Sequence, residues 1–163
     1  IPYAAARVGC LAGGWLSSRL VVANVPLNRA RKIVLGLSAS VMPAVLLIPG
    51  VPSGWALAIF SLAYFRQQSW STLVMILPTD MYPRSAIGAV AGLVGFGGAM
   101  GGVVFGQVVG TLLDRGFGYG IVFTLAGSFH VLAFIILCVT IPIIAPVRLP
   151  SAGQAPAPVP ATR

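Results

Sequence analysis

The sequence contains little charge and almost no acid. Only 7% of its 163 residues are charged, and the acidic ones are Asp80 and Asp114, against ten Lys and Arg. A soluble domain carries about a quarter of its residues as charged side chains, so this composition excludes an ordinary water-soluble domain. A net charge of +8 on a polar background would suggest nucleic acid. Here the cations separate long apolar runs, so the expected partner is the lipid bilayer and not nucleic acid.

Groups that carry catalysis or bind metals are also scarce. The chain has one histidine, His130, and two cysteines, Cys10 and Cys138, each inside an apolar segment. No phosphate-binding glycine loop, catalytic-triad spacing or pair of carboxylates is present, so we expect no enzyme, no cofactor and no metal site. The chain starts at Ile1 without the pattern of a signal peptide. We therefore expect it to be the C-terminal part of a longer protein.

Long uncharged intervals predict an all-α membrane protein. Residues 33–65, 85–113 and 116–147 contain no charged side chain, and each exceeds the roughly 20 residues that span a bilayer as a helix. Within one transmembrane unit, residues 1–146, we predict five transmembrane helices, over about 2–22, 33–48, 54–77, 84–113 and 119–144. Residues 147–163 are rich in Pro and Ala and are predicted to form a disordered tail.

The basic residues predict the orientation. Four of them cluster between the first two predicted helices: Arg19, Arg29, Arg31 and Lys32. Positive charge gathers on the cytoplasmic side of membrane proteins. This rule places that connector and the C-terminus in the cytoplasm, as expected for a multi-pass protein of the inner (cytoplasmic) membrane.

Arg66 stands near the middle of the predicted helix 54–77. An arginine at the bilayer centre costs on the order of 2.5–3.5 kcal/mol on insertion scales, so something must offset that cost. Asp80 and Asp114 lie at helix ends and are not natural partners for it. One interpretation is that Arg66 binds an anion in a water-filled path, and the other is that it pairs with groups outside this chain. Its polar neighbours Gln67, Gln68, Ser71 and Thr72 favour a binding site, because one helix rarely carries so many hydrogen-bonding groups facing lipid.

Small residues recur at four-residue spacing on two of the predicted helices. Gly9 and Gly13 form such a stripe in the first helix, and Gly98, Gly102 and Gly106 form one in the fourth. Stripes of this kind allow two membrane helices to pack closely. His130 is interpreted either as a proton relay or as a neutral, hydrogen-bonded side chain, and Arg7 as a residue that snorkels to the membrane surface.

Two motifs resemble the major facilitator superfamily. They are Gly-Gly-Trp-Leu-Ser-Ser-Arg at 13–19, followed by Asn-Arg-Ala-Arg-Lys at 28–32, and Leu-Pro-Thr-Asp-Met-Tyr-Pro-Arg-Ser-Ala-Ile-Gly at 77–88. Together with the glycine-rich helix they are similar to the anion:cation symporter family, in particular its hexuronate and sugar-acid branch. The resemblance implies helices eight to twelve of a twelve-helix carrier, whose N-terminal helices lie outside this chain.

The same resemblance implies proton-coupled uptake of an organic anion, such as a hexuronate or aldonate, by alternating access. Arg66, Gln67 and Thr72 become candidate substrate contacts, with Gln68 and Ser71 beside them, and the basic loop would latch the cytoplasmic gate. The glycine stripes would slide against the other half of the carrier. The chain departs from the family pattern at Ser18, where the loop motif usually has Asp.

Two alternatives to the sugar-acid symporter stay open. A carrier of the same fold could move another anion, such as an aromatic carboxylate or a phosphate ester. A stand-alone or remnant membrane protein would have no transport activity.

Overall fold

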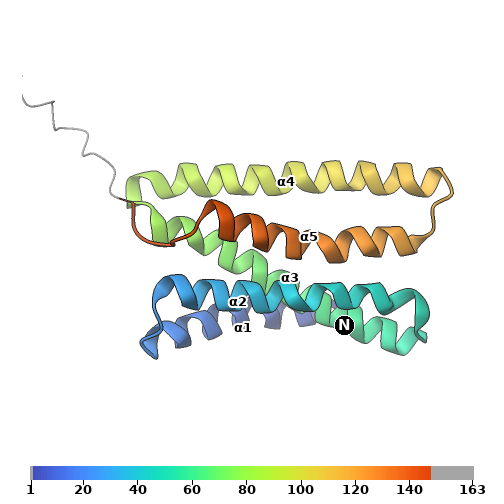
Figure 1. The fold of residues 1–163 in the computed structure, drawn as a ribbon, viewed down its shortest axis with the longest axis horizontal. Helices are drawn as coiled ribbons and strands as arrows, with labels where there is room; N and C mark the ends of the chain where they lie inside the picture. Colours follow the sequence, from blue (N-terminus) through green and yellow to red (C-terminus); the bar gives the residue numbers. More distant parts are fainter. Residues whose placement is uncertain (1, 148–163) are drawn as a thin grey trace, which may run out of the picture.

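The computed structural model describes residues 2–147, which form helices joined by short turns (Figure 1). The α-helices are α1 (Pro2–Val22), α2 (Leu27–Val41), α3 (Ser53–Met81), α4 (Arg84–Asp114) and α5 (Tyr119–Thr140), and a 3-10 segment, η1 (Met42–Gly50), continues α2. This confirms the all-helical prediction. By length and composition, three stretches could cross a membrane, Leu27–Gly50, Arg84–Asp114 and Tyr119–Thr140. The helices α1 and α3 fall outside that group.

Proline accounts for the boundaries of the second predicted helix. It begins at Leu27 instead of residue 33, directly after Pro26, which is extended at φ −52° and ψ 137°. The α-helix gives way to the 3-10 segment where Pro43 follows Met42, because proline has no N–H to donate to the carbonyl four residues back. The Met42 N–H already bonds to the Ala39 carbonyl, three residues back. The remaining turns to Gly50 therefore keep the tighter 3-10 pattern.

The ends of α3 and α5 also differ from the predicted ends. The helix α3 continues through Pro78 to Met81, beyond the predicted end at residue 77. It closes with a hydrogen bond from the Tyr82 N–H to the Pro78 carbonyl, 3.0 Å. The helix α5 ends at Thr140, before the predicted end at 144, because Pro142 follows.

Two helices end in a left-handed residue that turns the chain back. Asn24 after α1 has φ 62°, and Gly116 after α4 has φ 80°. In both turns the next N–H reaches the carbonyl five residues back, from Val25 to Leu20 and from Phe117 to Leu112, each at 3.0 Å. This Schellman pattern satisfies carbonyls that a helix end leaves unpaired, so α1 and α4 each stop in a tight reversal.

The helices are packed unequally. In Figure 1 α3 crosses diagonally between the α1–α2 pair and the α4–α5 pair. The core consists of two clusters, one of Val34, Leu35 and Leu73 and one built around Met42 and Val45. Both join α3 to α2 or η1, with α5 side chains packed on them. No residue of α4 is buried, so α4 is the least integrated helix among residues 2–147.

Residues after α5 return across the ends of other helices. The Ile144 N–H donates to the Asn28 side-chain oxygen at 3.1 Å, and Ile144 itself is buried. The Val147 N–H donates to the Met81 carbonyl at 2.6 Å. Val147 is the first residue of the predicted tail, and the rest of that tail, residues 148–163, lies outside the described residues.

Candidate functional site

Glycine allows α1 and α3 to touch along their backbones. A Cβ added at Gly9 would lie 2.0 Å from the Phe65 carbonyl oxygen, and one at Gly13 would lie 2.8 Å from the Ser69 Cα. The Ser69 hydroxyl is buried in this contact and lies 2.7 Å from the Gly9 carbonyl oxygen, to which it donates. The stripe on α1 thus packs against α3 within this chain, whereas the family resemblance implied a sliding contact with another half.

A groove of about 400 Å³ lies between α1 and α3, and most of the surface that lines it is apolar. It is lined by Tyr3, Ala6 and Arg7 from α1 and by Tyr64, Gln67 and Gln68 from α3. The rings of Tyr3 and Tyr64 meet edge to face with centroids 5.7 Å apart. The residues that line this groove carry one guanidinium, two carboxamides and two phenols, groups that can donate hydrogen bonds to an anion at the edge of the groove.

Thr72 and Ser71 lie next to this groove on α3. The Thr72 hydroxyl oxygen lies 2.8 Å from the Gln68 carbonyl and 3.1 Å from the Cys10 sulfur, so it sits between the two helices. Ser71 is half-buried one helical turn after Gln67. The structure thus brings Gln67 and Gln68 together in the groove and keeps Ser71 and Thr72 near them.

Arg66 occupies a different side of α3. At 3.6 residues per turn it shares a face with Ala63 and Leu73, which pack on η1 and α2 respectively. Its guanidinium carbon lies 5.4 Å from the centroid of the Phe65 ring. Its Nε is buried without a hydrogen-bond partner in the described part of the chain, and Arg66 is not among the residues that line the groove. The structure thus does not place Arg66 in the groove, and a partner outside this chain, as in the second interpretation, would satisfy its buried Nε.

Sequence reasoning assigned Arg7 no role in a site, because it stands near a helix end where snorkelling is common. The structure places Arg7 in the groove with Gln67 and Gln68. Tyr3 and Arg7 are four residues apart on α1, as are Tyr64 and Gln68 on α3. That four-residue spacing places each pair on one face of its helix, which was the available sequence signal for a polar site. The spacing does not show which helices face each other.

Gln67 also contacts α5. Its side-chain oxygen lies within hydrogen-bond reach of His130 Nε2, and the His130 ring meets the Trp70 ring edge to face at 5.6 Å. Gln67 and His130 line a second cavity of about 440 Å³. Its other walls are mostly apolar and include Phe60, Phe105 and Phe123. The structure therefore links His130 to the groove through one carboxamide.

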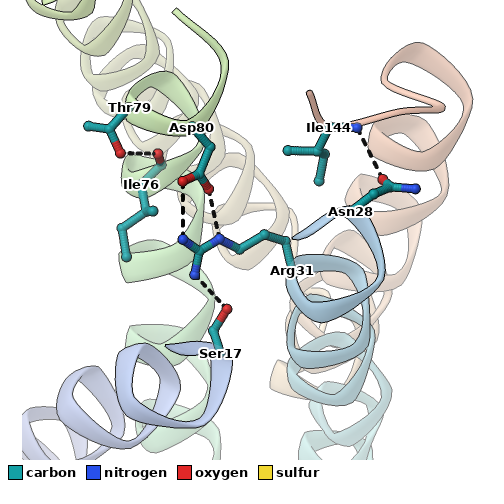
Figure 2. Close-up of polar contacts among 7 residues, drawn as sticks. All are labelled: Ser17, Asn28, Arg31, Ile76, Thr79, Asp80 and Ile144. Carbon is teal, nitrogen blue, oxygen red and sulfur yellow. Dashed lines mark hydrogen bonds and ion pairs between the residues drawn. The ribbon is translucent and has the colours of Figure 1, made fainter. Parts of the chain in front are cut away.

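A buried ion pair joins three helices at the end where α1 meets α2 (Figure 2). Arg31 Nε and Nη2 donate to the two carboxylate oxygens of Asp80 at 2.7 and 3.1 Å. Arg31 Nη1 donates to the Ser17 hydroxyl at 2.6 Å. The side chains of Arg31 and Asp80 are only 10% and 14% exposed. Sequence reasoning placed Arg31 in a basic loop and gave Asp80 no partner.

The other basic residues of the predicted gating loop are dispersed. Lys32 Nζ donates to the Pro142 carbonyl at 2.8 Å. Arg19 lies over the Trp15 ring, 5.1 Å from its centroid, and Arg29 is exposed. Of the four residues, Arg31 is the one that fastens α1, α2 and α3 together.

The glycine stripe of α4 faces open space. A Cβ at Gly98, Gly102 or Gly106 would find no heavy atom of the described residues within 4 Å. Among residues 2–147 no group of three or more His, Cys, Asp or Glu side chains could hold a metal ion.

Comparison with known proteins gives one informative similarity. No protein-family model matches the chain. The chain is 31% identical over 121 residues to a D-galactonate transporter of Escherichia coli O6:H1. The aligned part covers 73% of this chain and 27% of the transporter, so the chain spans about a quarter of the length of that relative. The similar protein is a transporter and not an enzyme, in agreement with the expectation from the sequence. The long apolar helices and this similarity together indicate a multi-pass membrane protein.

Proposed function

We propose that this chain is part of a carrier that moves a sugar acid across a membrane. The observation that carries the proposal is the groove between α1 and α3, where Arg7, Gln67 and Gln68 line the same space. A guanidinium matches a carboxylate with two parallel hydrogen bonds, and carboxamides bind hydroxyl groups as donor or acceptor. The similarity to a D-galactonate transporter supports an aldonate or a hexuronate as the cargo.

In this proposal α1, α2 with η1, α3, α4 and α5 are five membrane spans, helices eight to twelve of a twelve-helix major facilitator fold. The remaining helices lie outside this chain and contribute the other wall of the groove and the acids that couple transport to protons. The two halves expose the site alternately to each side of the membrane. The open glycine stripe of α4 supplies a surface for the other half.

The proposed location is the inner membrane. The positive-inside rule places the Arg31–Asp80 end of the helices and the C-terminus in the cytoplasm. The ion pair then holds three helices together on the cytoplasmic side of the groove, where it would brace the gate.

We include Gln67, Gln68, Ser71 and Thr72 among the proposed substrate contacts and name Arg7 as the guanidinium that binds the carboxylate. Arg66 lies on another side of α3, so it could bind the carboxylate only from that side. The phenols of Tyr3 and Tyr64 also suit an aromatic carboxylate, so that cargo is the second candidate.

The test is uptake of labelled D-galactonate by cells that express the complete protein containing this chain. Hexuronates, aldonates, aromatic carboxylates and phosphate esters compete in parallel, and a protonophore tests coupling. We expect sugar acids to compete best and the protonophore to abolish accumulation. Best competition by an aromatic acid would transfer the proposal to that class, and absence of any anion uptake would refute it.

A matched pair of variants locates the site. Arg7→Gln removes the charge from the groove, and we expect it to lower uptake at least tenfold, as for loss of a charge-assisted bond of about 1.5–3 kcal/mol. Arg29→Gln removes an equal charge from an exposed position, and we expect little change. Equal effects of the two variants would mean that Arg7 acts only through overall charge.

A further inference from the structure

Gln67 occupies the boundary between two cavities. It lines the groove with Arg7 and Gln68, and it lines the apolar cavity with His130. Its carboxamide has two different ends, a carbonyl oxygen that only accepts hydrogen bonds and an NH2 group that only donates them. Which end faces the groove determines whether Gln67 attracts or repels an anion there.

In the structure the oxygen end of the Gln67 carboxamide faces His130. The oxygen Oε1 of Gln67 lies within hydrogen-bond reach of His130 Nε2. Since a carbonyl oxygen cannot donate, Nε2 must carry the hydrogen. This orientation of the carboxamide corresponds to a ring with its hydrogen on Nε2.

The ring that donates this bond is held by packing. The rings of Trp70 and His130 meet edge to face with centroids 5.6 Å apart. The ring of Phe134, one turn further along α5, also meets the Trp70 ring edge to face, with centroids 6.5 Å apart. Trp70 lies on α3 three residues after Gln67, so both contacts to His130 come from the same helix. This arrangement keeps Nε2 aimed at the carboxamide of Gln67.

We propose that His130 is a positioning residue for the substrate site. By binding Oε1 of Gln67 it turns the NH2 group of Gln67 away from α5, so that both N–H groups are available to oxygen atoms in the groove. The inference rests on the proposed function, since the oxygen atoms bound there are those of the sugar acid. Without His130 the carboxamide can rotate and present its oxygen to the anion, which repels it.

The first test is spectroscopic and independent of transport. In the complete protein labelled with ¹⁵N-histidine and held in lipid, the His130 signals are identified by their loss in His130→Phe. We expect a protonated Nε2 and an unprotonated Nδ1, and a changed Nε2 shift in Gln67→Leu. A ring with its hydrogen on Nδ1 alone would overturn the proposal, whatever the protein transports.

The second test separates KM from the maximal rate of uptake. His130→Phe keeps an aromatic ring but loses the donor, and we expect KM to rise about tenfold, equivalent to about 1.4 kcal/mol. His130→Gln places an amide N–H at a similar distance from the backbone and should return KM to within about twofold of the original. The control Phe134→Leu disturbs the same packing without a polar group, so it should alter expression or maximal rate and leave KM unchanged.

A double variant tests whether His130 acts through Gln67. If it does, His130→Phe combined with Gln67→Leu should have the same KM as Gln67→Leu alone. If the two substitutions multiplied their effects on KM, or if His130→Phe left KM unchanged, the positioning role would be overturned. Saturable uptake by the unaltered protein would in that case still support the carrier function. Absence of saturable uptake in the unaltered protein would instead refute the carrier function, and with it the role of His130 in substrate binding.

Discussion

The close contact of α1 with α3 can be tested by adding one methyl group. In Gly9→Ala the new Cβ would lie 2.0 Å from the Phe65 carbonyl oxygen and 2.7 Å from the carbonyl carbon. Both atoms belong to the backbone, so no side-chain rotation can relieve the clash. In Gly14→Ala the nearest atom is the Thr72 Cγ2 at 3.9 Å, an ordinary van der Waals contact. The two variants make the same chemical change on the same helix.

The magnitude follows from the distance that the helices must move. A carbon and a carbonyl oxygen approach each other to about 3.3 Å, so α1 and α3 must separate by more than 1 Å at Gly9. That movement lengthens the 2.7 Å bond from the Ser69 hydroxyl to the Gly9 carbonyl beyond hydrogen-bond distance. Such a bond contributes about 0.6–1.7 kcal/mol between membrane helices, and overpacking costs about 1–3 kcal/mol. We expect a loss of about 2–4 kcal/mol in unfolding free energy.

The assay is equilibrium unfolding of the purified complete protein in mixed detergent micelles. Gly14→Ala should change the unfolding free energy by less than about 1 kcal/mol, because alanine is also the better helix former. The uptake rate of Gly9→Ala should fall as well, since Tyr3 and Arg7 line the groove from the same helix. Equal losses in the two variants would refute the reasoning, because they would reflect glycine content and not a backbone contact.

Three other predictions concern charge and completeness. Asp80→Asn leaves Arg31 buried without its carboxylate and should lower the unfolding free energy by about 3 kcal/mol, whereas Arg31→Leu with Asp80→Leu should recover part of that loss; the same micelle assay checks both. Arg66→Ala should lower expression and uptake in equal proportion, because Arg66 is not among the residues that line the groove; loss of uptake at normal expression would make Arg66 a substrate contact. Residues 1–163 alone, reconstituted in liposomes, should not accumulate sugar acids, because half of the site lies in other helices.

Hydropathy predicted the helices better than their ends. The uncharged intervals identify α4 and α5 directly, because they contain no charged side chain that would be costly in lipid. The end of α3 was predicted at residue 77 from Pro78, yet the helix continues to Met81. A proline removes one backbone hydrogen bond, and the last turn is held by other bonds, including those from Arg31 to Asp80. Those bonds join residues 49 positions apart in the sequence, so no local pattern contained them.

The polar run on α3 predicted which helix carries the site but not which of its sides. Arg66, Gln67 and Gln68 are consecutive, so on a helix they point about 100° apart and cannot all line one groove. The docking of α1 selects the side of Gln68, and it does so through Gly9 and Gly13, which carry no chemistry themselves. The cation of the groove then comes from α1 as Arg7. Sequence alone could not choose between two arginines on different helices.

The two glycine stripes are equivalent in sequence and opposite in structure. On α1 the stripe is filled by the backbone of α3, whereas on α4 nothing of the described residues lies against Gly98, Gly102 or Gly106. Because the contact on α1 is between backbone atoms, we expect the proposed groove to keep its shape when other parts of the carrier move. In the proposed carrier we expect the movement of an alternating-access cycle to occur at α4, the helix without a buried residue. The site would travel as a unit while α4 changes its neighbours.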